Sequence, residues 1–161
     1  MCLVAIAREV HPDYPLIVIA NRDEFYIRNT ARADWWAGEA EIVGGKDLQA
    51  GGTWMAAHKD GRWGCVTNYR DLSHPQNPHA PSRGDLIPAY LQGKKDPFSF
   101  LEEVHANDAG YNGYNLLVGQ GEEIWHYSNQ EKRINPVASG VHGLSNHLLN
   151  TPWPKVVRLT E

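Results

Sequence analysis

The chain has 161 residues, of which 42% are hydrophobic and 21% charged; these fractions suit one globular domain over residues 1–161 and argue against wholesale disorder. Fifteen basic residues stand against 19 acidic ones, a formal net charge of −4. Nucleic-acid binding usually needs a basic surplus, so the composition argues against a nucleic-acid partner.

The longest apolar runs, residues 2–7 and 16–20, are far shorter than the roughly 20 residues that span a bilayer. The start of the chain lacks the pattern of a secretory leader. Two cysteines, Cys2 and Cys65, do not form a disulfide framework. We therefore expect a cytoplasmic protein with reduced thiols and no membrane span.

Apolar and β-branched stretches separated by turn residues predict antiparallel hairpins. The expected strand pairs are residues 2–10 with 15–20, 53–58 with 62–68, and 114–119 with 123–128, and residues 140–145 form a further strand.

Helices are predicted from their N-terminal signals. Ser82 and Asp85 resemble a capping box, and Asp96 followed by Pro97 is typical of an N-cap with proline in the first turn. A last helix is expected from Thr151, with no stop signal after it, so we expect the natural protein to continue. Hairpins with helices grouped in blocks predict an α+β fold.

Residues 71–81 contain Pro75, Pro78 and Pro81. This composition predicts a surface loop, which could act as a lid over a site.

Cys2 is the strongest candidate for chemistry. Removal of the initiator methionine would leave a cysteine that carries its own α-amino group, whose pKa near 7.7–8 makes it a usable base at neutral pH. One residue would then supply both nucleophile and base, and a thiol needs less activation than a hydroxyl. The alternative is an incidental strand residue next to the initiator methionine.

The first predicted hairpin suggests what lies opposite this thiol. A loop of residues 11–14 would place Cys2 opposite Asp23, with Cβ atoms about 4.5–5.5 Å apart. Arg22 would point to the other face unless a bulge at Asn21 turned it. The polar run of residues 21–24 also fits an ordinary solvated loop.

Asn21-Arg22-Asp23-Glu24, after the apolar residues 17–20, resembles the signature of the NRDE proteins, also called the transport and Golgi organisation 2 family. The resemblance covers essentially the whole chain. Further motifs follow in the family's order: Gly51-Gly52-Thr53-Trp54, Thr67-Asn68-Tyr69-Arg70, Ser82-Arg83-Gly84, Tyr114-Asn115-Leu116-Leu117, Ser128-Asn129, Gly143-Leu144-Ser145-Asn146 and Thr151-Pro152-Trp153-Pro154-Lys155.

This family is similar to the N-terminal nucleophile hydrolases, which implies a four-layer αββα sandwich of antiparallel sheets, here incomplete at the C-terminus. The cysteine members of that group, such as bile-salt and penicillin V amidases, imply catalytic roles for a set of residues. The positions that match are Cys2, Arg22, Asp23, Asn68 and Asn146. A later catalytic arginine would fall near Lys155 or Arg158, and neither position fits well.

The resemblance implies that an amide transfers its acyl group to Cys2 with release of its amine, and that water then hydrolyses the acyl-thioester. Asn68 and Asn146 would donate to the oxyanion, or act as strand-end caps. Arg22 would hold an anionic group or the thiolate, or form a surface ion pair. The expected substrate-binding residues in the same motifs are Trp54, Arg70 and Arg83.

Two other functions stay open. The resemblance implies one of them, a carrier of haem or of a lipid such as acyl-CoA, with haem as cargo rather than cofactor. A haem carrier needs an axial His or Cys, and the candidates include His58, His126 and His142. The other is a scaffold with an inactive site. We expect no metal, because the histidine spacings match no common zinc pattern. We expect the partner to be a small-molecule substrate or ligand. The oligomeric state is not predicted.

Two motifs have simpler explanations. Gly51-Gly52-Thr53-Trp54 is better explained as a tight turn before a strand than as an anion cradle. Trp35 and Trp36 could line an apolar pocket with Trp54, although core packing is the default for tryptophan.

Overall fold

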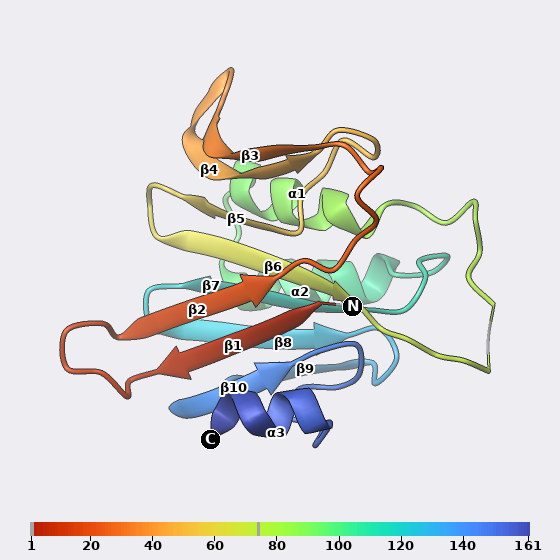
Figure 1. The fold of residues 1–161 in the computed structure, drawn as a ribbon. Helices are drawn as coiled ribbons and strands as arrows, with labels where there is room; N and C mark the ends of the chain where they lie inside the picture. Colours follow the sequence, from red (N-terminus) through yellow and green to blue (C-terminus); the bar gives the residue numbers. More distant parts are fainter. Residues whose placement is uncertain (1, 74) are drawn as a thin grey trace.

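The computed structural model describes residues 2–73 and 75–161 and shows an α+β fold with two antiparallel sheets (Figure 1). The large sheet has seven strands in the order β3-β4-β5-β6-β7-β8-β9, and the small sheet has three in the order β10-β1-β2. The strands are β1 Leu3–Arg8, β2 Leu16–Asn21, β3 Thr30–Trp36, β4 Glu39–Asp47, β5 Met55–His58, β6 Arg62–Asn68, β7 Tyr114–Gln120, β8 Glu123–Ser128, β9 Arg133–Pro136 and β10 Gly140–Leu144.

Helices cover the outer faces of both sheets (Figure 1). They are the 3₁₀ turn η1 Arg83–Asp85 and the α-helices α1 Leu86–Gln92, α2 Pro97–Asn107 and α3 Pro154–Thr160. Helix α1 packs on β5 and β6, α2 on β7, β8 and β9, and α3 on β10 and β1. The layers therefore run helix, small sheet, large sheet, helices, which confirms the predicted α+β sandwich.

The hydrophobic core has two parts, one on each face of the large sheet. Ile6, Leu117 and Leu144 are buried between the sheets, whereas Leu116 and Tyr127 pack under the helices. Because successive side chains of a strand point to opposite faces, the consecutive Leu116 and Leu117 serve both parts. Strand β7 is therefore buried over almost its whole length, as expected for a strand covered on both faces.

The small sheet covers only part of the large one. Among the described residues, β2 pairs with β1 alone, so it is an edge strand. A cavity of about 540 Å³ lies between β2 and strands β4–β6, lined by Leu16, Val18, Val43, Trp54 and Trp63 among others. We call this space the apolar cavity.

The predicted register of the first hairpin is wrong by one residue. Strand β1 pairs with β2 so that Leu3 lies opposite Asn21 and Ile6 opposite Val18. The cause is the turn: the N–H of Glu9, in the left-handed conformation, donates to the carbonyl of Pro15. This turn is one residue longer than predicted, and a one-residue shift exchanges the faces of all side chains.

The other two predicted hairpins are confirmed as β5–β6 and β7–β8. Gly61, in the left-handed conformation, closes the first of them. The hairpin β3–β4 and the short strand β9 were not predicted. Strand β3 is mostly exposed and its pairing is interrupted by register shifts, so it lacks the alternation that marks a half-buried strand.

The predicted helices are present, with corrections at their starts. The Asp96 side chain accepts from the N–H of Ser99 at 2.9 Å, which confirms the predicted N-cap of α2. No capping box forms at Ser82 and Asp85; a 3₁₀ turn leads into α1 instead. Helix α3 begins at Pro154, a little later than expected.

Within residues 71–81, the described residues form no helix or strand, as predicted; His74 lies outside them. In the same described part of the chain, no helix is both long enough and apolar enough to cross a bilayer.

Candidate functional site

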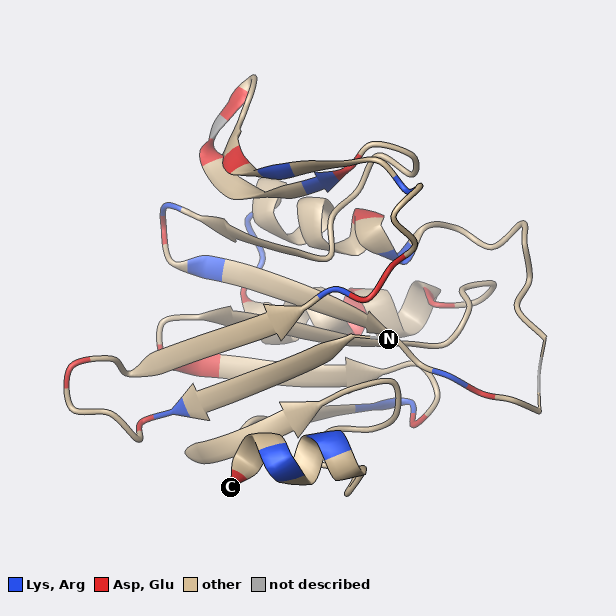
Figure 2. Ribbon diagram, in the orientation of Figure 1, with Lys and Arg blue, Asp and Glu red and all other residues tan. Residues whose placement is uncertain are grey.

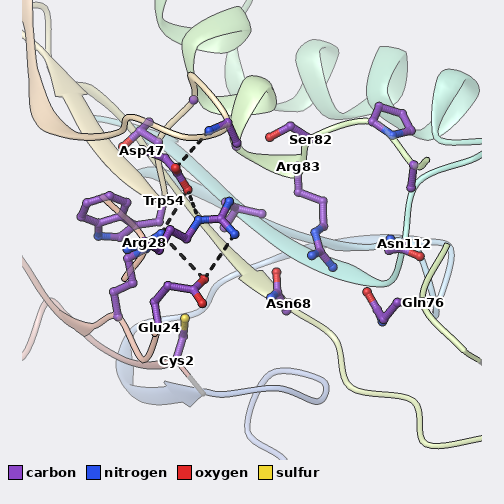
Figure 3. Close-up of a pocket in the computed structure, with 18 of the residues that line it drawn as sticks. Cys2, Glu24, Arg28, Asp47, Trp54, Asn68, Gln76, Ser82, Arg83 and Asn112 are labelled. Carbon is purple, nitrogen blue, oxygen red and sulfur yellow. Dashed lines mark hydrogen bonds and ion pairs between the residues drawn. The ribbon is translucent and has the colours of Figure 1, made fainter. Parts of the chain in front are cut away.

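A charged cavity of about 430 Å³ opens where β2 and β6 end (Figure 3). The strands around β1, β2 and β5–β8 carry little charge, whereas the β3–β4 hairpin and the loop after β2 combine acidic and basic residues (Figure 2). We call this space the polar cavity. Its lining includes Cys2, Arg22, Asp23, Glu24, Arg28, Asp47, Gly52, Trp54, Asn68, Gln76, Asn77, Ser82, Arg83 and Asn112.

Cys2 immediately precedes β1 and is half-buried at the cavity wall. Its backbone is held from the other end of the chain, because the Ser145 hydroxyl donates to the Cys2 carbonyl at 2.9 Å. The Lys155 ammonium donates to the same oxygen at 3.5 Å. The predicted removal of Met1 concerns a residue outside those described.

Two motifs hold each other across the sandwich beside this thiol. The Thr67 hydroxyl donates to the Ser145 carbonyl at 3.0 Å, and the Asn146 side-chain amide donates to the Asn68 carbonyl at 2.9 Å. The N–H of Arg70 donates to the Asn146 carbonyl at 2.8 Å. These bonds tie the end of β6 to the residues after β10, and so join the two sheets at the polar cavity.

A buried polar network continues beneath this junction. The Asn115 side chain donates to the His147 carbonyl at 2.9 Å and lies 3.4 Å from the Thr67 hydroxyl. Its oxygen lies 3.1 Å from Nε2 of His126. Burial lowers the pKa of His126 to about 4, so this imidazole is neutral at pH 7 and accommodated as an uncharged hydrogen-bonding group.

Asp47 neutralises two of the arginines. Its carboxylate contacts the Arg22 guanidinium at 3.1 Å and that of Arg28 at 2.7 Å. Glu24 lies 3.8 Å from Arg22 and 3.7 Å from Arg28. Arg22 thus forms an ion pair, the alternative to its predicted anion-binding role, although its partner is mainly Asp47.

Asp47 also orders its own loop. Its other carboxylate oxygen accepts from the N–H groups of Gln49 and Ala50 at 3.0 and 3.1 Å. Burial alone would raise the pKa of Asp47, but these bonds and the Arg28 guanidinium outweigh it and hold the pKa below its usual range. Asp47 therefore stays ionised and fixes one wall of the cavity.

Arg22 also stacks on Trp54, with its guanidinium carbon 4.4 Å from the ring centroid, a cation–π contact. Trp54 lines both the polar and the apolar cavity and so separates them. Trp36 is buried under the helices and Trp35 is half-exposed, which places them in neither cavity lining.

Arg83 enters the polar cavity from the opposite side (Figure 3). Its Nη1 donates to the Gly113 carbonyl at 3.0 Å, and burial lowers its pKa. Asn68 lies between Arg83 and Cys2 in the same view, at the end of β6. No described residue pairs with its side-chain amide, which leaves that group available to a ligand.

The motif Gly51-Gly52-Thr53-Trp54 forms the predicted turn, with Gly51 in the left-handed conformation. It also holds Arg83 in place. The N–H of Thr53 donates to the Gly84 carbonyl at 3.0 Å, and a Cβ added at Gly52 would lie 2.4 Å from the Gly84 carbonyl carbon. The second glycine therefore permits a close approach of two backbones.

Six of the sequence-predicted site residues line the polar cavity: Cys2, Arg22, Asp23, Trp54, Asn68 and Arg83. The register error changes which residue faces Cys2 across the hairpin, yet Asp23 still reaches the same cavity. Asn146 and Arg70 lie outside this lining and act at the junction of the sheets. The oxyanion role of Asn146 and the ligand contact of Arg70 stay predictions.

Sequence reasoning missed Glu24, Arg28, Asp47, Gln76, Ser82 and Asn112 as cavity residues. Glu24 belongs to the recognised motif and could have been included. Asp47 ends β4, a strand that was not predicted, so its position was hidden with that strand.

The three candidate histidine ligands lie apart. His58 lines the apolar cavity, His126 is buried between the sheets in the network with Asn115, and His142 contacts Ala138 and Asn150. Within residues 2–73 and 75–161, no three His, Cys, Asp or Glu side chains gather as a metal site.

Comparison with known proteins shows the family of the chain. The family model described as Transport and Golgi organisation 2 matches residues 1–161. The chain belongs to the Transport and Golgi organisation 2 family. A mouse relative, Transport and Golgi organization 2 homolog, is 37% identical over 169 residues, covering 97% of this chain and 60% of the mouse protein.

Other relatives agree in extent. Transport and Golgi organization protein 2 homolog from Bos taurus is 38% identical, covering 97% of this chain and 60% of that protein. Transport and Golgi organization protein 2 from Drosophila melanogaster is 28% identical, covering 97% of this chain and 61% of that protein. The chain thus spans about three-fifths of the length of these relatives.

Proposed function

We propose that this protein hydrolyses the amide bond of a small, non-peptide substrate through an acyl-thioester on Cys2. The observation that carries the proposal is the meeting of the Cys2 thiol, the Asn68 amide and the Arg83 guanidinium around one cavity (Figure 3). The names of the relatives give no reaction, so the proposal rests on the chemistry of this cavity.

The first half of the reaction forms a thioester. The Cys2 sulfur attacks the amide carbonyl carbon, the C–N bond breaks, and the amine leaves with the proton taken from the thiol. In the second half water attacks the thioester carbonyl, the C–S bond breaks, and the carboxylic acid leaves while the sulfur regains a proton. Atoms and charges balance with water as the only co-reactant.

Proton transfer is assigned to the α-amino group that Cys2 would carry after removal of Met1. An amine with a pKa near 8 is partly neutral at pH 7 and can accept the thiol proton. Asp23, on the same cavity, supplies a carboxylate to compensate the ammonium that forms.

Asn68 is assigned to the oxyanion. Its side-chain amide reaches the cavity without a described protein partner, so its N–H groups can donate to the developing negative oxygen. Loss of one such donor commonly costs about 2.7–4 kcal/mol of transition-state stabilisation. Asn68→Ala should therefore slow acylation about 10²–10³-fold without changing the fold, since this side chain is exposed at a strand end.

The test begins with the intact mass of the purified protein, which reports whether Met1 is removed. The protein is then incubated with a panel of small N-acyl p-nitroanilides, and p-nitroaniline release is followed by absorbance. Acid-quenched samples are digested and searched for an acyl adduct on the peptide that contains Cys2. We expect an adduct at Cys2 and at least about thousandfold slower release in Cys2→Ala.

Cys65→Ala is the matched control. Cys65 is buried between the sheets, and burial raises its pKa to about 12, so its thiol is inert at neutral pH. Release unchanged in Cys65→Ala and lost in Cys2→Ala supports the proposal. Equal release in wild type and Cys2→Ala, or no acyl adduct at Cys2 with any member of the panel, contradicts it.

A further inference from the structure

The polar cavity contains three arginines whose charges are balanced differently. Arg22 and Arg28 share the Asp47 carboxylate at 3.1 and 2.7 Å, and both approach Glu24. Arg83 has no carboxylate partner among the described residues; its neighbour is the neutral Gly113 carbonyl. Burial lowers the pKa of Arg83 and the charge of Glu24 partly opposes this, yet no described carboxylate lies within ion-pair distance of this guanidinium.

The surroundings of Arg83 suit an anionic ligand. A guanidinium presents five N–H donors, and one bond to a carbonyl leaves most of them directed to the cavity (Figure 3). The guanidinium is largely withdrawn from solvent, and burial lowers its pKa. An unpaired cation in such a place is unfavourable unless a ligand supplies the opposite charge.

Arg83 is also held in position for binding. It begins η1, whose Gly84 is fixed against the Gly52-Thr53 backbone by the bond from the Thr53 N–H. The bond to Gly113 restrains the guanidinium itself. A restrained, planar guanidinium favours bidentate binding of a carboxylate and loses little entropy when it binds.

We propose that Arg83 binds a carboxylate of the substrate close to the amide that Cys2 attacks, so that the substrate is an N-acyl amino acid or a similar amide acid. This inference rests on the proposed function for the position of the amide. Asp23 and Glu24 line the same cavity, so a singly charged anion is favoured over a dianion such as phosphate.

Alkylation of Cys2 tests the inference without any substrate. The Cys2 sulfur displaces iodide from both iodoacetate and iodoacetamide. The two reagents differ in charge, because iodoacetate carries a carboxylate and iodoacetamide a neutral amide. The ratio of their second-order rate constants at Cys2 is measured by peptide mass spectrometry in folded protein and in urea. We expect the ratio to be at least about tenfold higher in folded protein, the factor that one charge-assisted hydrogen bond commonly supplies.

Variants assign this preference to Arg83. Arg83→Gln should lower the ratio to its value in urea, and Arg83→Lys should keep part of it. Arg32→Gln, which removes an exposed arginine of β3 outside the cavity lining, should leave the ratio at the wild-type value. Circular dichroism verifies that each variant is folded. An unchanged ratio in folded Arg83→Gln would overturn the inference.

A second measurement uses wild-type protein alone. N-acetylglycine should protect Cys2 from iodoacetamide, whereas N-acetylglycinamide at the same concentration should not. Equal protection by both compounds, or stronger protection by inorganic phosphate, contradicts a carboxylate site. Because these assays need no turnover, a carboxylate preference without p-nitroanilide hydrolysis would overturn the proposed function alone, and hydrolysis without that preference would overturn this inference alone.

Discussion

Trp54 separates two cavities of similar size and opposite chemistry. The polar cavity, about 430 Å³, is lined by loops and strand ends, and the apolar cavity, about 540 Å³, by the faces of β2 and β4–β6. The difference follows from which groups each wall offers. Strand faces within a sandwich present apolar side chains, whereas strand ends and loops carry the polar groups that chemistry needs.

The two cavities therefore differ in how they contribute to stability on either side of Trp54. Ion pairs and a buried polar network shape the polar cavity, and their contribution depends on pH. Packing shapes the apolar cavity, and the contribution of packing to stability does not depend on pH.

Acid should produce the largest change in stability, through the network beneath the polar cavity. The pKa of His126 falls from 6.5 to about 4 on folding, so the unfolded chain binds the extra proton more readily. Stability therefore falls as the pH drops from 6.5 towards 4, by about 3 kcal/mol in total. Urea unfolding at several pH values measures this loss, and His126→Gln should flatten the plot of unfolding free energy against pH between pH 4 and 6.5. An equally steep plot for the variant would exclude His126 as the cause.

Trp54→Ala should join the two cavities. The change removes a half-buried indole and its contact with Arg22, so we expect a loss of about 2–3 kcal/mol, below the 3–5 kcal/mol of a fully buried aromatic residue. Urea unfolding gives the value, and Trp35→Ala, at a side chain that is 51% exposed, is the control. Similar losses in both variants would show that Trp54 is no partition.

Asp47→Asn tests the ion pairs of the polar cavity. It leaves Arg22 and Arg28 without their shared carboxylate, and we expect a loss of about 2 kcal/mol at pH 7. Because the pKa of Asp47 is lowered on folding, the carboxylate stabilises the fold above its unfolded value of 3.8 and less as the pH falls below it. The variant and the wild type should therefore converge in acid. Asp13→Asn, in an exposed turn, serves as control, and curves that stay parallel down to pH 2 would contradict this role.

Val18→Ala addresses the apolar cavity and should have the smallest effect. Val18 is half-buried, so the loss of two methyl groups should cost about 1 kcal/mol. The iodoacetamide rate at Cys2 should stay at the wild-type value, because Val18 lines only the apolar cavity. A slower rate would mean that the two cavities are coupled.

The sequence allowed prediction of the elements whose signals are local. The Asp-Gly turn of β5–β6 and the Asp96 cap of α2 each depend on a few neighbouring residues, and both formed as expected. The register of β1 and β2 depended on the length of one turn, which residue types alone do not determine. The exposed, irregular β3 carries no periodic signal and was missed.

The site divides in the same way. Cys2 could be proposed from its place next to the initiator methionine, and Asn68 from the motif that resembles the family's. The link between Asp47 and Arg22 joins residues far apart in sequence and depends on the unpredicted β4. The bond from the Asn146 amide to the Asn68 carbonyl exists only where the two sheets meet, so sequence reasoning could not foresee it.

The unpaired edge of β2 has a consequence for work with the purified protein. Within the described residues, the outer edge of Leu16-Ile17-Val18-Ile19 has no paired strand, so its main-chain N–H and C=O groups are open to pairing. This segment contains no lysine or proline to discourage pairing, and Ile19 is 65% exposed. Any extended polypeptide can add to such an edge as one more strand. Self-association should therefore grow steeply with concentration, and dilute samples give the most faithful kinetics.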